Sequence, residues 1–187
     1  MIGQLQFQYL VQQGLDRDSY LLDVGCGAGR GGIHFARYLA PAHYFGVDSN
    51  EHLIRAALSR EFPHAGVEDR VPAANFRLTS RFDVDFGVLF DFALAHSVFT
   101  HLPLNHLQLC LFRMSQVMRE GGRFFVTFFE PEAGQSFDQP GRQVNVVTYP
   151  ERDPFHYRRI DLEWAASSVA DGSFAISETG ATREGRG

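Results

Sequence analysis

The sequence predicts an α/β fold, a three-layer sandwich in which helices cover both faces of a mostly parallel sheet. Short apolar runs alternate along the chain with segments of helical periodicity, which is typical of parallel strand-helix-strand units. The 187 residues, of which 44% are hydrophobic, are enough for one domain with a substantial core. No internal repeat divides them, so we expect a single domain over residues 1–187.

The strands of this sheet are expected where short apolar runs are bounded by turn residues. They are Tyr20 to Val24, Tyr44 to Val47, Asn75 to Thr79, Phe90 to His96, and Gly122 to Glu130. Ahead of the first strand, the aromatic and glutamine-rich segment Leu5 to Gln13 could form a short helix over the mouth of a site.

Helices are expected between these strands. The first runs from Arg30 to Leu39, and the second from Asn50 to Glu61 with Asp48 or Ser49 as its cap. A third, Leu104 to Arg119, ends at the pair Gly121-Gly122. It carries apolar residues at helical spacing, namely Leu107, Leu111, Met114 and Met118.

The end of the chain has a different character. Residues 131–157 form a long loop rich in Gly, Pro, Gln and Asp, and loops of this length are usually functional or mobile. We expect a helix at Leu162 to Ala170, one strand at Phe174 to Ser177, and a flexible polar tail over 181–187.

Composition excludes several classes of function. All 17 basic residues are arginine, so neither a pyridoxal phosphate Schiff base nor a lysine-bearing phosphate loop is available. A net charge of -5 without a basic run argues against a nucleic-acid partner. No apolar stretch is long enough to span a bilayer, and residues 1–4 have neither the basic nor the apolar region typical of a signal peptide, so we expect a cytoplasmic location. Cys26 and Cys110 lack metal-ligand spacing, so we expect no metal.

The glycine loop Gly25-Cys26-Gly27-Ala28-Gly29 is the strongest local signal. It lies between an expected strand and an expected helix, where glycines let backbone approach a ligand closely. Asp48 ends the next strand, and an acid there can accept hydrogen bonds from both hydroxyls of a ribose.

Two residues decide which kind of cofactor such a loop would bind. Arg30 occupies the position where a dinucleotide fingerprint has Gly or Ala, and the carboxylate of Asp23 would repel a pyrophosphate. Asp23 would instead help to order the loop around a cationic ligand that carries a free amino group. An NAD(P)-dependent reductase is therefore the less favoured enzyme class.

These motifs resemble those of class I S-adenosylmethionine-dependent methyltransferases, which have a Rossmann-like fold. Residues 21–30 are similar to the first family motif, residues 44–48 to the second, and residues 97–102 to a variant of the fourth that is common in small-molecule enzymes. The resemblance implies that the cofactor is S-adenosylmethionine, with S-adenosylhomocysteine as product. It assigns cofactor binding to the following residues: Asp23, Gly25, Cys26, Gly27, Gly29, Asp48, Ser49 and His96.

The adenine end departs from the family pattern, because the acid expected after the third strand is late or missing. Either Asp83 reaches the ring, or Ser80 and the local backbone replace it while Phe82 packs on one face. We favour the second arrangement, which also includes Arg81. The family's final strands are also incomplete in this sequence. We therefore expect a shortened sheet or a disordered terminus, or else a domain swap in a homo-oligomer.

Methyl transfer from a sulfonium depends mainly on positioning, and a general base helps when the acceptor is a hydroxyl. His96 and His101 flank the end of the fourth strand, and His101 is our candidate catalytic base. Each could instead be a packing or capping histidine. The aromatic and charged residues of 148–157 would suit the wall of a pocket for a small hydroxylated molecule, or they merely dock the loop. We expect a small-molecule methyltransferase acting on oxygen, and the alternative is a non-catalytic S-adenosylmethionine-binding protein.

Overall fold

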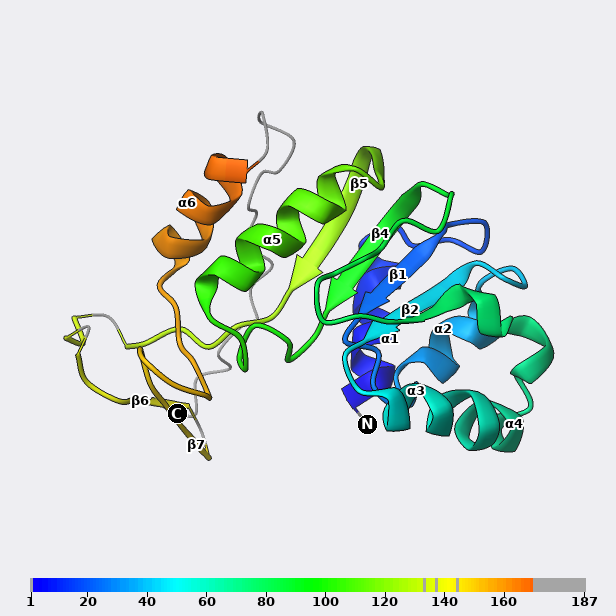
Figure 1. Cartoon of the computed structure of the whole chain (residues 1–187), viewed down its shortest axis with the longest axis horizontal. Helices are drawn as coiled ribbons and strands as arrows, with labels where there is room; N and C mark the ends of the chain where they lie inside the picture. The colour runs from blue at the N-terminus through cyan, green and yellow to red at the C-terminus, as the bar shows by residue number, and fades with distance from the viewer. Residues whose placement is uncertain (1, 133, 137, 144, 170–187) are drawn as a thin grey trace.

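The computed structural model of the chain describes residues 2–132, 134–136, 138–143 and 145–169. Its main sheet has five strands in the order β3-β2-β1-β4-β5, and every neighbouring pair is parallel. The strands are β1 (Leu21–Val24), β2 (Tyr44–Asp48), β3 (Phe76–Leu78), β4 (Phe90–Ala95) and β5 (Met118–Val126). This sheet, with helices on both faces, confirms the predicted α/β fold class (Figure 1).

Helices cover both faces of the sheet because successive strand residues point to opposite sides. Leu21 pairs with Tyr44 and Leu22 with Phe45. The first pair belongs to one core cluster and the second pair to another. The two clusters therefore meet at the sheet, and β1, β2, β4 and β5 contribute to both.

One core cluster is closed by helices from the first part of the chain, α1 (Ile2–Gln12), α2 (Gly32–Tyr38), the π-helical turn Ala57–Glu61 and α4 (Phe62–Ala65). The helix α3 (Glu51–Ala56), which has no buried residue, leads into the π-helical turn. The other cluster is closed by α5 (Leu104–Ser115) and α6 (Arg159–Val169), which lie side by side in Figure 1. Two 3-10 turns, Glu68–Arg70 and Ala73–Asn75, lead into β3. Among the described residues, no helix is both long and apolar enough to cross a membrane.

The boundary between α5 and β5 corrects the sequence prediction. The helix stops at Ser115 rather than Arg119, and β5 begins at Met118 rather than Gly122. Met118 continues the apolar spacing of the helix, but it pairs with Phe90 in the sheet. The register then shifts around Gly121, whose φ is 75°. The pair Gly121-Gly122 therefore forms an irregularity within β5 and does not end α5.

The cap of α3 also differs from the prediction. Asn50 is the cap, and its side chain accepts hydrogen bonds from the backbone N–H groups of His52 and Leu53. The predicted cap was Asp48 or Ser49. Asp48 is instead the last residue of β2, two positions before the cap, and its carboxylate accepts hydrogen bonds from the N–H groups of Gly27 and of Asn50 itself.

The long loop contains a small antiparallel hairpin of β6 (Gly141–Gln143) and β7 (Val146–Thr148). After the hairpin the chain returns to the main body, where His156 forms an isolated parallel bridge with Phe129. The helix expected at Leu162 to Ala170 corresponds to α6, which ends at Val169 among the described residues. The strand expected at 174–177 and the tail at 181–187 lie outside the described residues.

Candidate functional site

The glycine loop follows β1 and turns back over the end of β2. Its three glycines have positive φ values, 76° at Gly25, 56° at Gly27 and 72° at Gly29, which side chains rarely adopt. A Cβ at Gly25 would lie 2.5 Å from the Val98 side chain, and one at Gly29 would lie 2.5 Å from the Phe62 ring. A Cβ at Gly27 would meet nothing within 4 Å. Gly25 and Gly29 are therefore fixed by packing, whereas Gly27 borders open space.

Asp48 connects the glycine loop to α3. Its Oδ2 accepts a hydrogen bond of 2.8 Å from the N–H of Gly27, and its Oδ1 accepts one of 2.8 Å from the N–H of Asn50. A carboxylate has about four acceptor positions, so about two stay available for the hydroxyls of a ligand. Ser49, the next residue, is exposed beside it.

Asp23 is a buried acid directly below the loop, with only 8% of its surface exposed. The hydroxyl of Tyr44 donates a hydrogen bond of 2.7 Å to its Oδ2. Burial raises the pKa of Asp23 to about 6, the hydrogen bond from Tyr44 lowers it, and the charge of Asp48 raises it further. Asp23 therefore carries a carboxyl group that titrates close to neutral pH.

Cys26 fills space inside the loop. A Cβ at Gly46 would lie 2.8 Å from the Cys26 sulfur, so this thiol packs directly against β2. Burial raises the pKa of the Cys26 thiol well above its ordinary value, and the negative charges of Asp23 and Asp48 raise it further. The thiol stays protonated at neutral pH and is unsuited to act as a nucleophile.

The loop after β3 is held by its own hydrogen bonds. Oγ1 of Thr79 accepts from the N–H groups of Arg81 and Asp83, both at 3.1 Å, and it lies 3.2 Å from Oδ2 of Asp83. Ser80 and Arg81 are exposed. Phe82 has a φ of 56° and is buried, with its ring centroid 6.1 Å from that of Phe99 in the loop after β4. The loop after β3 and the loop after β4 thus contact each other through these two aromatic rings.

His96 and Ser97 follow β4 directly. The backbone N–H of Ser97, a residue with a φ of 56°, donates to Oγ1 of Thr127 at 2.8 Å. Its own hydroxyl lies 3.1 Å from Nδ1 of His96. Burial lowers the pKa of His96, so the neutral imidazole is favoured at physiological pH.

His101 is paired with an acid from the long loop. Its Nδ1 lies 2.7 Å from Oδ1 of Asp153, and both side chains are 57% exposed. Two more hydrogen bonds dock the same segment onto the loop after β4, from the Phe155 N–H to the Thr100 carbonyl and from the Tyr157 hydroxyl to the Leu102 carbonyl. Asp153 was not among the predicted site residues. The charged stretch between two prolines in residues 148–157 indicates a segment of interest but does not single out Asp153 or its partner.

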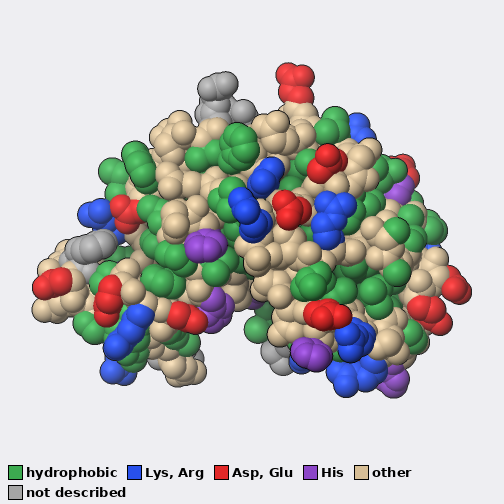
Figure 2. All heavy atoms as spheres, in the orientation of Figure 1, with side chains coloured by type: hydrophobic (Ala, Val, Ile, Leu, Met, Phe, Trp, Pro, Cys, Tyr) green, Lys and Arg blue, Asp and Glu red, His purple; other side chains and the backbone are tan. Residues whose placement is uncertain are grey.

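The predicted site residues therefore lie on loops that share one edge of the sheet. The strand order reverses between β1 and β4, and ligands of open α/β sheets bind at the carboxyl ends of strands beside such a reversal. The arrowheads of β4 and β5 point towards the lower edge of the molecule in Figure 1. The space-filling view shows an indentation in this edge, between the part that carries the β6–β7 hairpin and the part that carries α3 and α4 (Figure 2).

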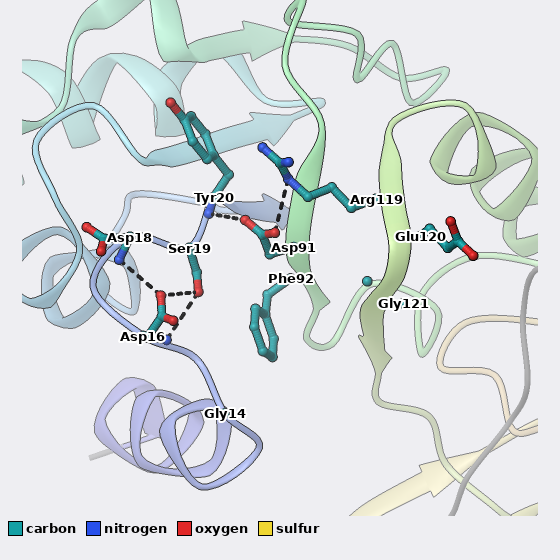
Figure 3. Close-up of a pocket in the computed structure, with 11 residues that line it drawn as sticks. Gly14, Asp16, Asp18, Ser19, Tyr20, Asp91, Phe92, Arg119, Glu120 and Gly121 are labelled. Carbon is teal, nitrogen blue, oxygen red and sulfur yellow. Dashed lines mark hydrogen bonds and ion pairs between the residues drawn. The ribbon is translucent and has the colours of Figure 1, made fainter.

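A second hollow, of about 440 Å³, lies at the opposite edge, around the amino ends of β1, β4 and β5 (Figure 3). Two of its acids, Asp16 and Asp91, hold neighbouring parts of the chain together. Asp16 accepts hydrogen bonds from Ser19, at 2.7 Å, and from the Asp18 N–H, and the bond from Ser19 is the main cause that lowers its pKa. Asp91 accepts from the Tyr20 N–H at 2.8 Å and lies 3.1 Å from Nε of Arg119. We therefore assign this hollow a structural role. Within the described part of the chain, no group of three or more His, Cys, Asp or Glu side chains could hold a metal ion.

Comparison with known proteins agrees with this geometry. The family model of a methyltransferase domain matches residues 22–124. Magnesium protoporphyrin IX methyltransferase (ChlM) from Synechocystis PCC 6803, solved with bound S-adenosylmethionine, is similar with a TM-score of 0.66 at 16% identity, over 96% of this chain and 70% of that one. An S-adenosylmethionine-dependent methyltransferase from Clostridium acetobutylicum has a TM-score of 0.60 at 16% identity, over 88% and 77% of the two chains.

The YcgJ protein from Bacillus subtilis is similar with a TM-score of 0.57 at 21% identity, over 70% of this chain. The present chain spans 53% of the length of YcgJ, which is about half. At these identities the structural likenesses establish the fold, and the domain match covers the segment that contains the glycine loop, Asp48 and His101.

Proposed function

The chain belongs to the class I S-adenosylmethionine-dependent methyltransferase family, and on that premise we propose that it transfers a methyl group to a hydroxyl oxygen of a small molecule. The observation that carries the choice of oxygen is the hydrogen bond between His101 and Asp153, 2.7 Å long, on the loop after β4. A hydroxyl must lose its proton during methylation, and a histidine oriented by a carboxylate is suited to accept it.

The residues of the first two loops fit the cofactor. Gly27 borders open space where backbone can approach a ligand, and Asp48 keeps acceptor positions for the ribose hydroxyls. Asp23 keeps one oxygen for the amino group of the methionine portion. In this proposal Ser80, Arg81 and Phe82 line the adenine end and His96 lies beside the sulfonium.

Bound S-adenosylmethionine supplies an electrophilic methyl group on its sulfonium sulfur. The chain's own residues position the acceptor and manage its proton. If Asp153 is ionised, it accepts the Nδ1–H of His101, and this tautomer leaves Nε2 free as a base. The proton of the acceptor hydroxyl passes to that nitrogen, and S-adenosylhomocysteine leaves as the product.

A transfer assay with methyl-labelled S-adenosylmethionine tests this function. The acceptors are a set of hydroxylated small molecules and the same molecules with each hydroxyl already methylated. We expect label only in the free hydroxyl compounds. His101→Ala should lower the transfer rate about 100-fold or more, the typical contribution of general base catalysis, and leave cofactor binding unchanged.

His64→Ala is the matched control, because His64 is an exposed histidine on α4 outside the proposed site. It should retain the full rate. Transfer to amines alone would overturn the choice of oxygen. Cofactor binding without transfer to any acceptor would favour the non-catalytic binding protein, and NAD binding without a response to the sulfonium ligand would favour a reductase.

A further inference from the structure

Tyr44 is a tyrosine whose hydroxyl group has no role in the function proposed so far. The residue is 1% exposed and lies in β2, where its ring packs among those of Phe35, Phe62 and Phe76. Packing alone would be served equally well by phenylalanine. A buried hydroxyl must also find a hydrogen-bond partner, and the partner here is Oδ2 of Asp23 at 2.7 Å.

The position of this hydroxyl is tightly constrained. A Cβ on Gly32, at the start of α2, would lie 2.3 Å from the Tyr44 oxygen. The absence of a side chain at Gly32 therefore leaves room for the hydroxyl beside Asp23. The position of the Tyr44 hydroxyl is therefore fixed jointly by the glycine loop, α2 and β2. This also fixes the position of one oxygen of Asp23.

Among the residues that the structure describes, no positive charge compensates that of Asp23. The groups that act on it electrostatically are Tyr44 and Asp48, and neither is cationic. Cys26 is the other titratable neighbour, and α2 presents only Gly32, Phe35 and Ala36 as buried residues. On the β4 side its register partner is Leu94. A buried carboxylate without a cation is costly, and a cationic ligand would remove that cost.

We propose that Tyr44 is a positioning residue for the cofactor. Its hydroxyl holds one oxygen of Asp23, so that the other oxygen receives the ammonium group of the methionine portion. This rests on the proposed function, because it requires the cofactor to occupy the glycine loop. It also extends that function, since cofactor affinity then depends on the ionisation of Asp23.

Calorimetric titration with S-adenosylhomocysteine between pH 5 and pH 8.5 tests the inference without turnover. Because the pKa of Asp23 in the free protein is raised to about 6, chiefly by burial, wild-type affinity should fall about tenfold from pH 7.5 to pH 5. Tyr44→Phe keeps the ring and removes the hydrogen bond. Its dissociation constant at pH 7.5 should rise about tenfold, and the midpoint of the pH dependence should move upwards.

The ligand 5′-methylthioadenosine separates this role from a general effect on the fold, because it carries the nucleoside but no amino-acid portion. Its affinity should be the same for wild type and for Tyr44→Phe. Tyr9→Phe is the matched control variant, since the Tyr9 hydroxyl is buried without a hydrogen-bond partner and its ring packs on Phe125. It should bind both ligands like the wild type.

The outcomes are distinguishable. Failure of the wild type to bind S-adenosylhomocysteine at any pH would overturn the proposed function and this inference with it. Normal wild-type binding with an unchanged pH midpoint in Tyr44→Phe would overturn the inference alone. Equal loss of both ligands in Tyr44→Phe would reduce Tyr44 to a packing residue. If the variant folds poorly, proton release on binding to the wild type at pH 6 gives the second measurement, and its absence would contradict the role of Asp23.

Discussion

At the scale of single residues, Asp23 meets two requirements that oppose each other. Its burial raises the pKa to about 6, so folding without ligand disfavours the charged carboxylate, whereas a ligand ammonium requires it. Because the folded pKa lies above the unfolded value, the stability that this group favours is fully present below about pH 4. It is lost as the pH rises through about 6.

Replacing Asp23 with Asn should therefore stabilise the ligand-free protein at neutral pH. A shift from 3.8 to about 6 corresponds to about 3 kcal/mol, and the neutral amide, which can still accept from Tyr44, avoids that cost. Urea unfolding at pH 4.5 and pH 7.5 checks this, with the difference between Asp23→Asn and wild type as the readout. The variant should gain about 3 kcal/mol at pH 7.5 but only about 1 kcal/mol at pH 4.5, and it should bind S-adenosylhomocysteine weakly. An identical pH dependence of the two proteins would contradict it.

At the scale of elements, the glycine loop combines glycines with different tasks. Gly27→Ala should cost about 1 kcal/mol of stability, because its φ is positive but the added methyl group meets no atom. Gly29→Ala should cost about 2 to 4 kcal/mol, because the methyl group also collides with the Phe62 ring. Urea unfolding measures both. Gly27→Ala should nevertheless weaken S-adenosylhomocysteine binding more than tenfold, since the methyl group enters the space left for the ligand.

If Gly27→Ala bound S-adenosylhomocysteine normally, the loop would not be the cofactor site. If the variant unfolded, the open space at Gly27 would be wrong. Gly29→Ala, where it remains folded at low temperature, should bind with nearly wild-type affinity. The two variants make the same chemical change two residues apart, so any general effect of alanine in the loop cancels in the comparison.

Elements were predictable where the signal is local. The strand, the glycine loop and Asp48 follow one another within a short stretch of sequence, and each has a strong residue pattern. The end of α5 was not predictable, because Met118 continues the helical spacing while its backbone pairs with Phe90. The α3 cap could not be assigned from the sequence, because β2 continues to Asp48 and the side chain of Asp48 turns to the glycine loop, where it accepts from the Gly27 N–H. Asp153 reaches His101 only through the path of the long loop, which no local pattern specifies.

At the scale of the whole molecule, the glycine loop touches both halves of the core. Gly25 lies against Val98, which packs on the cluster beneath α5 and α6, and Gly29 lies against Phe62 in the cluster beneath α1 and α2. The strands between them contribute side chains to both clusters. A ligand held by this loop should therefore stabilise the whole fold rather than one side of it, because neither cluster can open without disturbing the sheet that they share.

Ligand binding should consequently raise the free energy of unfolding by about 2.7 kcal/mol when S-adenosylhomocysteine is present at about 100 times its dissociation constant. Two probes follow the transition: circular dichroism, which reports all helices, and the fluorescence of the single tryptophan, Trp164, which lies on α6 far along the chain from the loop. Both should shift to the same higher urea concentration with an unchanged slope, and NAD should shift neither. If circular dichroism shifted while the Trp164 signal did not, α6 would unfold independently, and the coupling of both clusters through the sheet would be wrong.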